Sequence, residues 1–446
     1  MKKNTGVSDA ALKDIRMLYK KNRNIVGKIA SASVLLLMTA CASEKTDQVE
    51  EETLKLGFIA FGDSGYHVNY LKEKQYSPAR PTQDAFLASE RATWVKKKRP
   101  EAEFVALPSE YVEEVGSFVE SGGLYPVADA MQGYCSGVSC EFSVMLGDNI
   151  YPDGATSIGD NEARFDTLFS KPLGKLGEGN SNYRIYTTLG NHDWKTSREG
   201  AMAQVNFMET TKPFYMDGLF YTVKPTAAKG EVEIFVIDTE ILLSDTVVYE
   251  AELNDDGSER PTDELDLAEE WTKAHNESER NMVAWLEESL KKSTAKWKFV
   301  IGHHPIWSTG GTKFEQAKSL RKLILPAMCR YADVYFAGHE HSLELHEDSC
   351  ESVFGKGNTK PLLQIISGAA SKQRPVHTSF KAYQDKNYPE NSAIFAKGMT
   401  WGFAHINLDG DKAVVDLITT PNSGDATTHV EFSHQFNRRS KTSFSK

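Results

Sequence analysis

Five short apolar segments of this sequence are each followed at once by side chains that can bind metal ions. These side chains are Asp63, Asp148 with Tyr151, Asn191 with His192 and Asp193, His303 with His304, and His339 with His341. Carboxylate, amide, phenol and imidazole groups form a hard-to-borderline ligand set, with enough members for two metal ions that share one carboxylate. Two ions about 3.5–4 Å apart can hold a phosphoryl group and activate a water for in-line attack.

Each of these motifs, taken alone, also has a structural explanation. A Gly-Asp pair after a strand is commonly a turn, and Gly190-Asn-His-Asp193 could be a loop with Asx-type hydrogen bonds. His303 and His304 could be a hydrogen-bonded pair in the core. The recurrence of such motifs after five apolar runs favours a metal centre over five unrelated turns.

The apolar runs themselves have the length and composition of buried strands. They are rich in Val, Ile, Phe and Tyr and cover 54–61, 142–146, 184–189, 232–237, 297–301, 334–336, 362–366 and 413–418. Helical periodicity is clear in 282–292 and 315–331. Strands that alternate with helices and then follow one another predict a mixed α/β (α+β) fold, with two packed mixed β-sheets flanked by helices. Ligands gather at the carboxyl ends of strands, where Gly lets the chain turn sharply.

The order and types of the five motifs resemble those of the calcineurin-like metallophosphoesterase superfamily. Tyr151, in Gly147-Asp-Asn-Ile-Tyr-Pro-Asp-Gly154, stands where the purple acid phosphatases have their iron-binding tyrosine. The run from Val300 to Ser308 is similar to the small, tartrate-resistant type. The resemblance covers roughly 54–370 and implies a four-layer sandwich. It also implies a binuclear-metal acid phosphatase that hydrolyses phosphate monoesters by attack of a metal-bound hydroxide.

The resemblance assigns a role to each motif residue. It implies Fe(III) held by Asp63, Tyr151 and His341, a divalent Fe, Zn or Mn held by Asn191, His303 and His339, Asp148 as the bridge, and His192 as the catalytic proton donor. Phenolate and carboxylate ligands favour Fe(III), whereas neutral Asn and His suit a divalent ion. A phosphodiesterase or nucleotidase on the same metals is the alternative activity, and a non-catalytic surface lipoprotein is the alternative from another class.

The sequence departs from the family beyond Trp307-Ser308, where many small members place a further His near the substrate. His304 and His67 are candidate replacements, although a packing role is the stronger interpretation of each. Asp193 could orient His192 or a metal ligand, and a fold-stabilising role is equally consistent with its position.

The N-terminal segment has the features of an export signal. A Lys/Arg-rich stretch precedes an apolar run, 29–38, that is too short to span a membrane comfortably, and small residues then precede Cys41. This pattern resembles the bacterial lipobox and predicts an exported lipoprotein, attached through Cys41 to the periplasmic or outer surface of a membrane. A plain cleaved signal and an uncleaved anchor remain alternatives.

The remaining chain is predicted to have three parts. Residues 41–53 form an acylated tether, 54–421 the catalytic domain with insertions near 66–125 and 244–278, and 422–446 a solvated tail. Composition predicts that the second insertion, 244–278, which contains Asn254-Asp-Asp-Gly-Ser-Glu-Arg-Pro261, is a surface loop.

Four cysteines besides Cys41 fit an oxidising compartment. Local pairing, Cys135 with Cys140 and Cys329 with Cys350, is the preferred hypothesis, while the other pairings and four free thiols remain open.

The charge distribution limits the possible partners. Residues 1–40 hold eight Lys/Arg and two Asp, which leaves 43 basic and 60 acidic residues in 41–446. This excess of acidic residues in 41–446 argues against nucleic-acid binding, because proteins bind nucleic-acid phosphates through clustered Lys and Arg. It does not exclude a small phosphorylated substrate, because bound metal ions can dominate the local potential. The sequence leaves the oligomeric state open.

Overall fold

The structure of the chain is a computed structural model that describes residues 53–72, 80–156, 161–246, 248–253, 259–266, 269–310, 314–357 and 360–439. The predicted export signal, Cys41 and the tether up to residue 52 lie outside the described residues. Among the residues that the structure describes, no helix combines the length and the apolarity needed to cross a membrane.

Seven strands form the first sheet, in the order β18-β17-β16-β1-β4-β5-β6. The parallel half contains β1 (Lys55–Phe61), β4 (Ser143–Leu146), β5 (Ile185–Thr188) and β6 (Phe214–Tyr215). The antiparallel half contains β16 (Trp401–Asp409), β17 (Lys412–Thr420) and β18 (His429–Asn437). The strands β1, β4 and β5, which precede three of the motifs, are therefore neighbours that end at one edge of the sheet.

The second sheet also has seven strands, in the order β15-β13-β14-β12-β11-β8-β7. Its parallel centre contains β8 (Val232–Val236), β11 (Trp297–Ile301), β12 (Val334–Ala337) and β14 (Leu362–Ser367). The flanking antiparallel strands are β7 (Tyr221–Val223), β13 (Leu343–Asp348) and β15 (Asn391–Lys397). The remaining two motifs follow the neighbouring strands β11 and β12.

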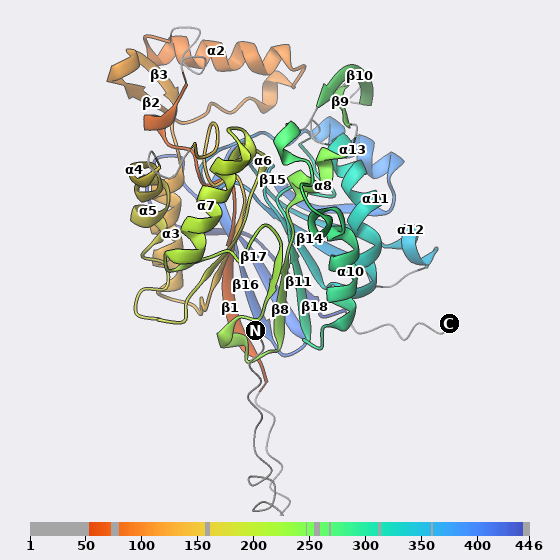
Figure 1. Cartoon of the computed structure of the whole chain (residues 1–446). Helices are drawn as coiled ribbons and strands as arrows, with labels where there is room; N and C mark the ends of the chain where they lie inside the picture. Colours follow the sequence, from red (N-terminus) through yellow and green to blue (C-terminus); the bar gives the residue numbers. More distant parts are fainter. Residues whose placement is uncertain are drawn as a thin grey trace, which may run out of the picture. The chain divides into compact units, whose positions relative to one another are not determined.

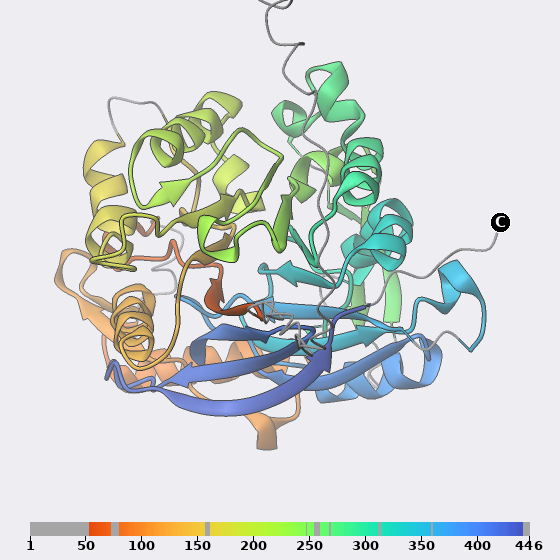
Figure 2. The same ribbon diagram turned by 90° about the horizontal axis from the view of Figure 1, so that it is seen from below.

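The two sheets pack face to face through aromatic side chains. The ring of Phe58 on β1 lies 5.5 Å from that of Phe299 on β11 and 5.9 Å from that of Phe336 on β12. The helices α3 (Leu124–Cys135) and α7 (Arg198–Thr210) lie on one side of this pair, and α10 (Met282–Lys292) and α11 (Phe314–Tyr331) lie on the other (Figures 1 and 2). The predicted fold class, two packed mixed sheets flanked by helices, is confirmed.

The other helices connect or cap these elements. They are α2 (Gln83–Lys96), α4 (Glu162–Phe165), α5 (Lys171–Leu173), α6 (Asn191–Trp194), α8 (Thr239–Ser244), α9 (Glu277–Arg280), α12 (Glu351–Phe354) and α13 (Thr378–Asn387). All eight strands and both helices predicted from the sequence are present, each within about two residues of its predicted bounds.

The prediction of a solvated tail over 422–446 is wrong for 429–437. This segment is β18, an edge strand that pairs with β17. Val430, Phe432 and Phe436 fall on alternate residues, as in a strand with one apolar face, and the ring of Phe432 stacks on Phe395 at 4.6 Å. The apolar content of this segment is low because only one face of an edge strand packs against the protein.

Both predicted insertions contain regular structure. The first, 66–125, includes α2 and the hairpin of β2 (Ser109–Val112) with β3 (Ser117–Glu120), and it lies above the carboxyl ends of the central strands (Figure 1). The second includes the antiparallel pair β9 (Val248–Leu253) and β10 (Glu259–Asp266). The prediction that this second insertion is a surface loop is therefore wrong over both of these strands.

The structure contains both predicted local disulfides. The bond between Cys135 and Cys140 follows the end of α3, and the bond between Cys329 and Cys350 joins α11 to the segment after β13. The preferred pairing is confirmed.

Candidate metal centre

The seven predicted metal ligands converge above the carboxyl ends of five strands from both sheets. Asp63 follows β1, Asp148 and Tyr151 follow β4, Asn191 follows β5, His303 follows β11, and His339 and His341 follow β12. Three of these residues, Asp63, Asp148 and His339, have positive φ angles of 56°, 52° and 68°. Such backbone costs about 1–3 kcal/mol per residue and concentrates at functional sites.

Glycine lets the loops of the two sheets approach one another closely. A Cβ atom on Gly338 would lie 2.6 Å from Oδ2 of Asp63, and one on Gly190 would lie 2.3 Å from Oδ1 of Asp148. Neither contact is sterically possible, so any larger residue would displace a carboxylate of the cluster. Glycine is therefore required in these motifs by the close packing of the loops as well as by the turn that it permits.

Asp63, Tyr151 and His341 form one compact group, which we name the oxygen-rich triad. The phenol oxygen of Tyr151 lies 2.9 Å from Oδ1 of Asp63 and 3.1 Å from Nε2 of His341. Nε2 of His341 lies 3.4 Å from the same carboxylate oxygen. One donor atom from each side chain thus faces a common point.

Asn191, His303 and His339 form a second group, the nitrogen-rich triad. Oδ1 of Asn191 lies 3.3 Å from Nε2 of His303 and 3.0 Å from Nδ1 of His339. The two imidazole nitrogens are 3.1 Å apart. Nδ1 of His303 lies 2.8 Å from the backbone oxygen of Leu146, which leaves Nε2 directed at the triad.

Asp148 joins the two triads. Its Oδ2 lies 2.7 Å from the phenol oxygen of Tyr151, and its Oδ1 lies 3.3 Å from Nε2 of His303. The two oxygens of one carboxylate therefore face different triads. This arrangement suits a carboxylate shared between two cations.

The electrostatics of the cluster fit bound cations. Burial, together with the charge of Asp148, raises the pKa of Asp63 to about 8. Burial and both carboxylates raise the pKa of the Tyr151 phenol well above its usual range. Burial lowers the pKa of His303, but Asp148 and Asp63 outweigh it and raise that pKa to about 10. Asp63 and Tyr151 thus favour protonated forms, whose protons a cation would replace, whereas His303 and His192 outweigh burial and hold the pKa of Asp148 well below its usual range.

His192 lies beside the cluster but belongs to neither triad. Its backbone N–H donates to Oδ1 of Asp148 at 2.8 Å, and its ring lies 4.3 Å from that of Tyr151. Nδ1 lies 2.6 Å from the backbone oxygen of Pro152, while Nε2 lies 3.1 Å from Nζ of Lys195. Burial lowers the pKa of His192 to about 4.

Asp193 has a structural position. Its buried carboxylate accepts hydrogen bonds from the backbone N–H groups of Asn149, Ile150 and Gly190, at 2.8–3.1 Å. Asp193 therefore links the loop that carries Asp148 to the loop that carries Asn191. This position matches the fold-stabilising role that the sequence left open for it.

A ring nitrogen of His304 lies within 4.8 Å of ring nitrogens of His303 and His339 in the nitrogen-rich triad, whereas His67 has its contacts outside both triads. Nδ1 of His304 lies 2.8 Å from Oγ1 of Thr239, although its ring packs 4.4 Å from that of His339. His67 accepts from the N–H of Asn69 and packs 5.6 Å from the ring of Tyr125. The position of His67 fits the packing role that was the stronger interpretation, while His304 is both hydrogen-bonded in the core and adjacent to the nitrogen-rich triad.

Two cations at the site were missed by sequence reasoning. Nη1 of Arg374 lies 2.9 Å from Oε2 of the buried Glu340, and Nζ of Lys372 lies 5.8 Å from the ring centroid of Tyr151. Both residues follow β14 (Leu362–Ser367), and Gly368 comes directly after this strand. The end of this sixth strand could have indicated that the loop after it lies at the site, but no motif of metal-binding residues follows it.

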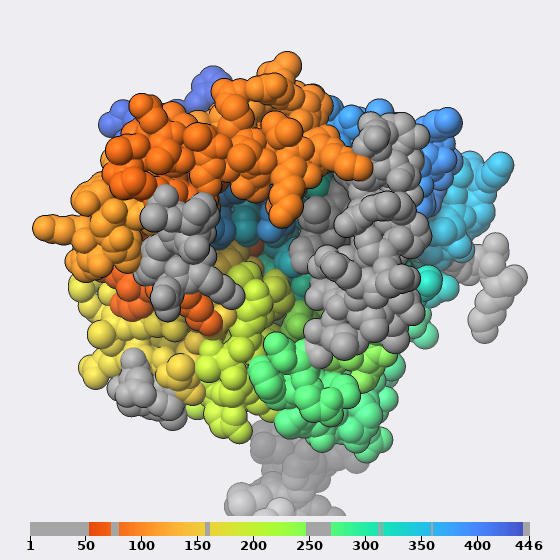
Figure 3. Space-filling view, turned by 90° about the horizontal axis from the view of Figure 1, so that it is seen from above, coloured from red at the N-terminus to blue at the C-terminus, as the bar shows by residue number. Residues whose placement is uncertain are grey.

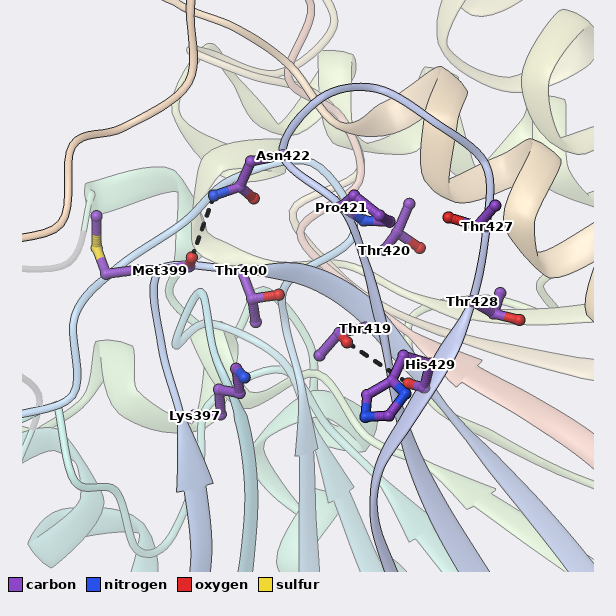
Figure 4. Close-up of a pocket in the computed structure, with 10 residues that line it drawn as sticks. All are labelled: Lys397, Met399, Thr400, Thr419, Thr420, Pro421, Asn422, Thr427, Thr428 and His429. Atoms are coloured by element: carbon purple, nitrogen blue, oxygen red, sulfur yellow. Dashed lines mark hydrogen bonds between the residues drawn. The ribbon is translucent and has the colours of Figure 1, made fainter.

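A separate cavity of about 320 Å³ lies at the β16–β18 edge of the first sheet (Figure 4). Its lining includes Lys397, Thr400, Thr420 and His429. No candidate metal ligand lines this cavity, so it is separate from the candidate metal centre at the five strand ends.

Comparison with known proteins agrees with this geometry. The model of the calcineurin-like phosphoesterase family matches residues 115–343, a range that holds six of the seven candidate ligands, with Asp63 preceding it. Purple acid phosphatase 4 of Arabidopsis thaliana is 26% identical over 271 residues, which cover 60% of this chain and 67% of the relative. Purple acid phosphatase 17 of the same plant is 28% identical over 239 residues, 53% of this chain and 60% of the relative.

A solved structure shares the fold across most of the chain. GAP50, the anchor in the inner membrane complex of Plasmodium, superposes with a TM-score of 0.53 at 15% sequence identity. The match covers 87% of this chain and 90% of that one. The resemblance to metallophosphoesterases that the motifs predicted is confirmed.

Proposed function

The chain belongs to the calcineurin-like phosphoesterase family, and we propose that within it the protein is a binuclear-metal acid phosphatase that hydrolyses phosphate monoesters. The observation that carries the proposal is the position of Asp148. One carboxylate reaches a phenol oxygen in the oxygen-rich triad and an imidazole nitrogen in the nitrogen-rich triad. Similarity to the purple acid phosphatases of Arabidopsis thaliana supports the same activity.

The two triads differ in the cation that each would hold. Asp63, Tyr151 and His341 would hold Fe(III), while Asn191, His303 and His339 would hold divalent Fe, Zn or Mn, with Asp148 shared between them. Such a pair of ions, when bound, polarises the phosphoryl group and activates a water for in-line displacement.

His192 would supply the proton for the leaving oxygen. With Nδ1 donating to the backbone oxygen of Pro152, Nε2 is the ring nitrogen that would reach a substrate atom, in exchange for its contact with Nζ of Lys195. The lowered pKa of about 4 means that the protonated form becomes populated only under acidic conditions. This favours an acidic optimum for departure of the leaving group.

The proposal is tested by comparing two substrates on the metal-loaded protein. We expect 4-nitrophenyl phosphate to be hydrolysed with a higher kcat/KM than bis(4-nitrophenyl) phosphate, with higher activity at acidic than at neutral pH. A dominant diester rate would assign the site to a phosphodiesterase. Hydrolysis of neither substrate by protein with two bound metal ions would contradict a phosphatase.

We further propose that the mature protein is exported and carries lipid on Cys41. The sequence pattern before Cys41 and two disulfides, which form in oxidising compartments, support this proposal. Replacing Cys41 by Ser should release the protein from the membrane fraction. Equal membrane retention of Cys41→Ser and wild type would contradict lipid anchoring.

A further inference from the structure

The segment His339–His341 supplies one ligand to each triad. His339 belongs to the nitrogen-rich triad and His341 to the oxygen-rich triad, with the buried Glu340 between them. The backbone N–H of His339 donates to Oδ2 of Asp63 at 2.7 Å, so this ligand is also bonded to a ligand of the other triad. The φ angle of His339 is 68°, in the left-handed region that a residue other than Gly adopts only when its surroundings hold it there. The position of His339 relative to the oxygen-rich triad therefore depends on what holds this segment.

Arg374, in the loop that follows β14, contacts all three residues of the segment. Its Nη1 donates to the backbone oxygen of His339 at 3.3 Å and to Oε2 of Glu340 at 2.9 Å. Its backbone N–H donates to the backbone oxygen of His341 at 2.9 Å. We name these three contacts the arginine clasp. Two of them need the guanidinium, whereas the contact with His341 needs only the backbone of Arg374.

Glu340 is closely packed where it meets the guanidinium. A Cβ atom on Gly310 would lie 2.4 Å from Oε2 of Glu340, and one on Gly368 would lie 2.2 Å from its backbone oxygen. Its Oε1 is buried and has no hydrogen-bond partner among the described residues, so the carboxylate depends on the hydrogen bond from Arg374 to Oε2. A buried carboxylate that loses its partner is strongly destabilising. Glu340 therefore anchors the guanidinium at the segment that carries both ligands.

The loop that carries Arg374 is itself held by other parts of the chain. The backbone oxygen of Arg374 accepts from the N–H of Met399 at 3.1 Å, and that of Ser371 accepts from the N–H of Gly123, in the first insertion, at 2.9 Å. In Figure 3 this insertion, in orange, borders a hollow at the top of the molecule, where blue and teal segments are visible below it. Hydrogen bonds thus hold the backbone at Arg374 and close to it.

We propose that Arg374 is a positioning residue, which through the arginine clasp fixes His339 and with it the nitrogen-rich triad relative to the oxygen-rich triad. This proposal rests on the binuclear centre of the function proposed above. Arg374 acts through His339 and is not itself a metal ligand.

The contacts of the clasp predict that the two triads depend on it unequally. Loss of the guanidinium removes the contacts with the oxygen of His339 and with Glu340, whereas the backbone contact with His341 stays. We therefore expect the ion of the nitrogen-rich triad to be bound more weakly and the oxygen-rich triad to keep its ion. Loss of a group that orients a metal ligand typically weakens metal binding about 10–100-fold.

The test measures the binding of Zn²⁺ by protein that retains iron, in competition with a chromophoric chelator. Arg374→Met should weaken Zn²⁺ binding by about 10–100-fold and should retain the visible tyrosinate-to-iron band. Arg80→Met is the matched control, because it removes a partly buried Arg from an ion pair with Glu90 in the insertion and should bind Zn²⁺ as the wild type does. Equal Zn²⁺ affinity in the two variants, or loss of the visible band from Arg374→Met, would overturn the proposal.

A double variant separates the position of the ligand from the stability of the fold. Arg374→Met leaves the buried carboxylate of Glu340 unpaired, which should lower the free energy of unfolding of the metal-free protein in urea. Adding Glu340→Gln removes that charge and should restore part of this free energy. The Zn²⁺ affinity should stay below that of the wild type, because the oxygen of His339 still lacks the guanidinium. Zn²⁺ affinity equal to that of the wild type in the double variant would mean that Arg374 only neutralises Glu340, and would overturn the proposal.

The same measurements distinguish this proposal from the phosphatase function. Wild-type protein that binds Zn²⁺ beside iron but hydrolyses neither nitrophenyl substrate would contradict the phosphatase, while the Zn²⁺ affinities of the variants would still test the clasp. Wild-type protein that binds no Zn²⁺ beside iron would overturn both the binuclear centre and the clasp.

Discussion

The oxygen-rich and nitrogen-rich triads have the same size but different chemistry. Two of the three donor atoms in the first belong to ionisable oxygens, whereas the second contains a neutral amide and two imidazoles. Each triad also draws on both sheets, since His341 joins residues that follow β1 and β4, and Asn191 joins residues that follow β11 and β12. Neither sheet alone builds a cation site, so correct packing of the two sheets is a condition for either triad.

Asp148→Asn should have the largest effect, because it alters both triads at once. We expect kcat to fall by about a thousandfold or more, which corresponds to roughly 4 kcal/mol of transition-state stabilisation. Bound metal should fall at both positions, measured by elemental analysis. Asp217→Asn, at an exposed position, is the matched control. Activity of Asp148→Asn close to that of the control would remove the bridging role.

Changes confined to one triad should have smaller effects that differ between the triads. Tyr151→Phe should abolish a visible tyrosinate-to-iron absorption band, and Asn191→Ala should keep the band while losing the divalent ion. Each should lower kcat/KM by about a hundredfold or more, because even the loss of a side chain that only supports a metal ligand costs about 10–100-fold. A visible band that survives in Tyr151→Phe would contradict the assignment of the oxygen-rich triad.

His192→Ala should lower turnover and leave both triads loaded. Removing a general acid typically reduces the rate by about a hundredfold, with metal content unchanged. His67→Ala, which removes an imidazole that packs on Tyr125, serves as the comparison and should have a much smaller effect. Loss of metal from His192→Ala would make this residue a ligand or a support of the triads.

The smallest expected effect is on the free energy of unfolding in acid, measured after a chelator has removed any bound metal. Burial lowers the pKa of His192 from 6.5 to about 4 in the folded state. Between these values the unfolded chain binds a proton that the folded chain does not, so the contribution of His192 to the free energy of unfolding decreases as the pH falls from 6.5 toward 4. In urea titrations, the free energy of unfolding of His192→Ala should therefore fall less steeply with decreasing pH than that of the wild type. Identical pH slopes for variant and wild type would contradict this pKa.

The sequence predicted the local elements of the site because each motif follows its own strand. Asp63, Asn191 and His303 could be predicted from a buried strand, the turn that follows it and the type of side chain. These three features are all local in the sequence. The pairing of the central strands then brings the motifs to a common edge. The positions of Lys372 and Arg374 depend instead on long-range contacts, of Lys372 with Glu120 and of Arg374 with Glu340, and no short-range pattern encodes these contacts.

The edge strand β18 shows a second limit of the sequence interpretation. Its apolar residues alternate, but exposed polar residues dominate the count, so composition indicated a solvated tail. Only pairing with β17 and the hydrogen bonds from the guanidinium of Arg439 to the backbone oxygens of Met328, Cys329 and Ala332 reveal its place in the fold. The contacts of Arg439 join segments more than a hundred residues apart, beyond any local pattern.

Metal stoichiometry, measured together with the visible spectrum of the purified mature protein, tests the central claim most directly. The convergence of seven side chains around Asp148 predicts two metal ions per chain and a purple or pink colour from Tyr151 bound to Fe(III). A single bound ion, or none after reconstitution with iron and zinc, would contradict a binuclear centre.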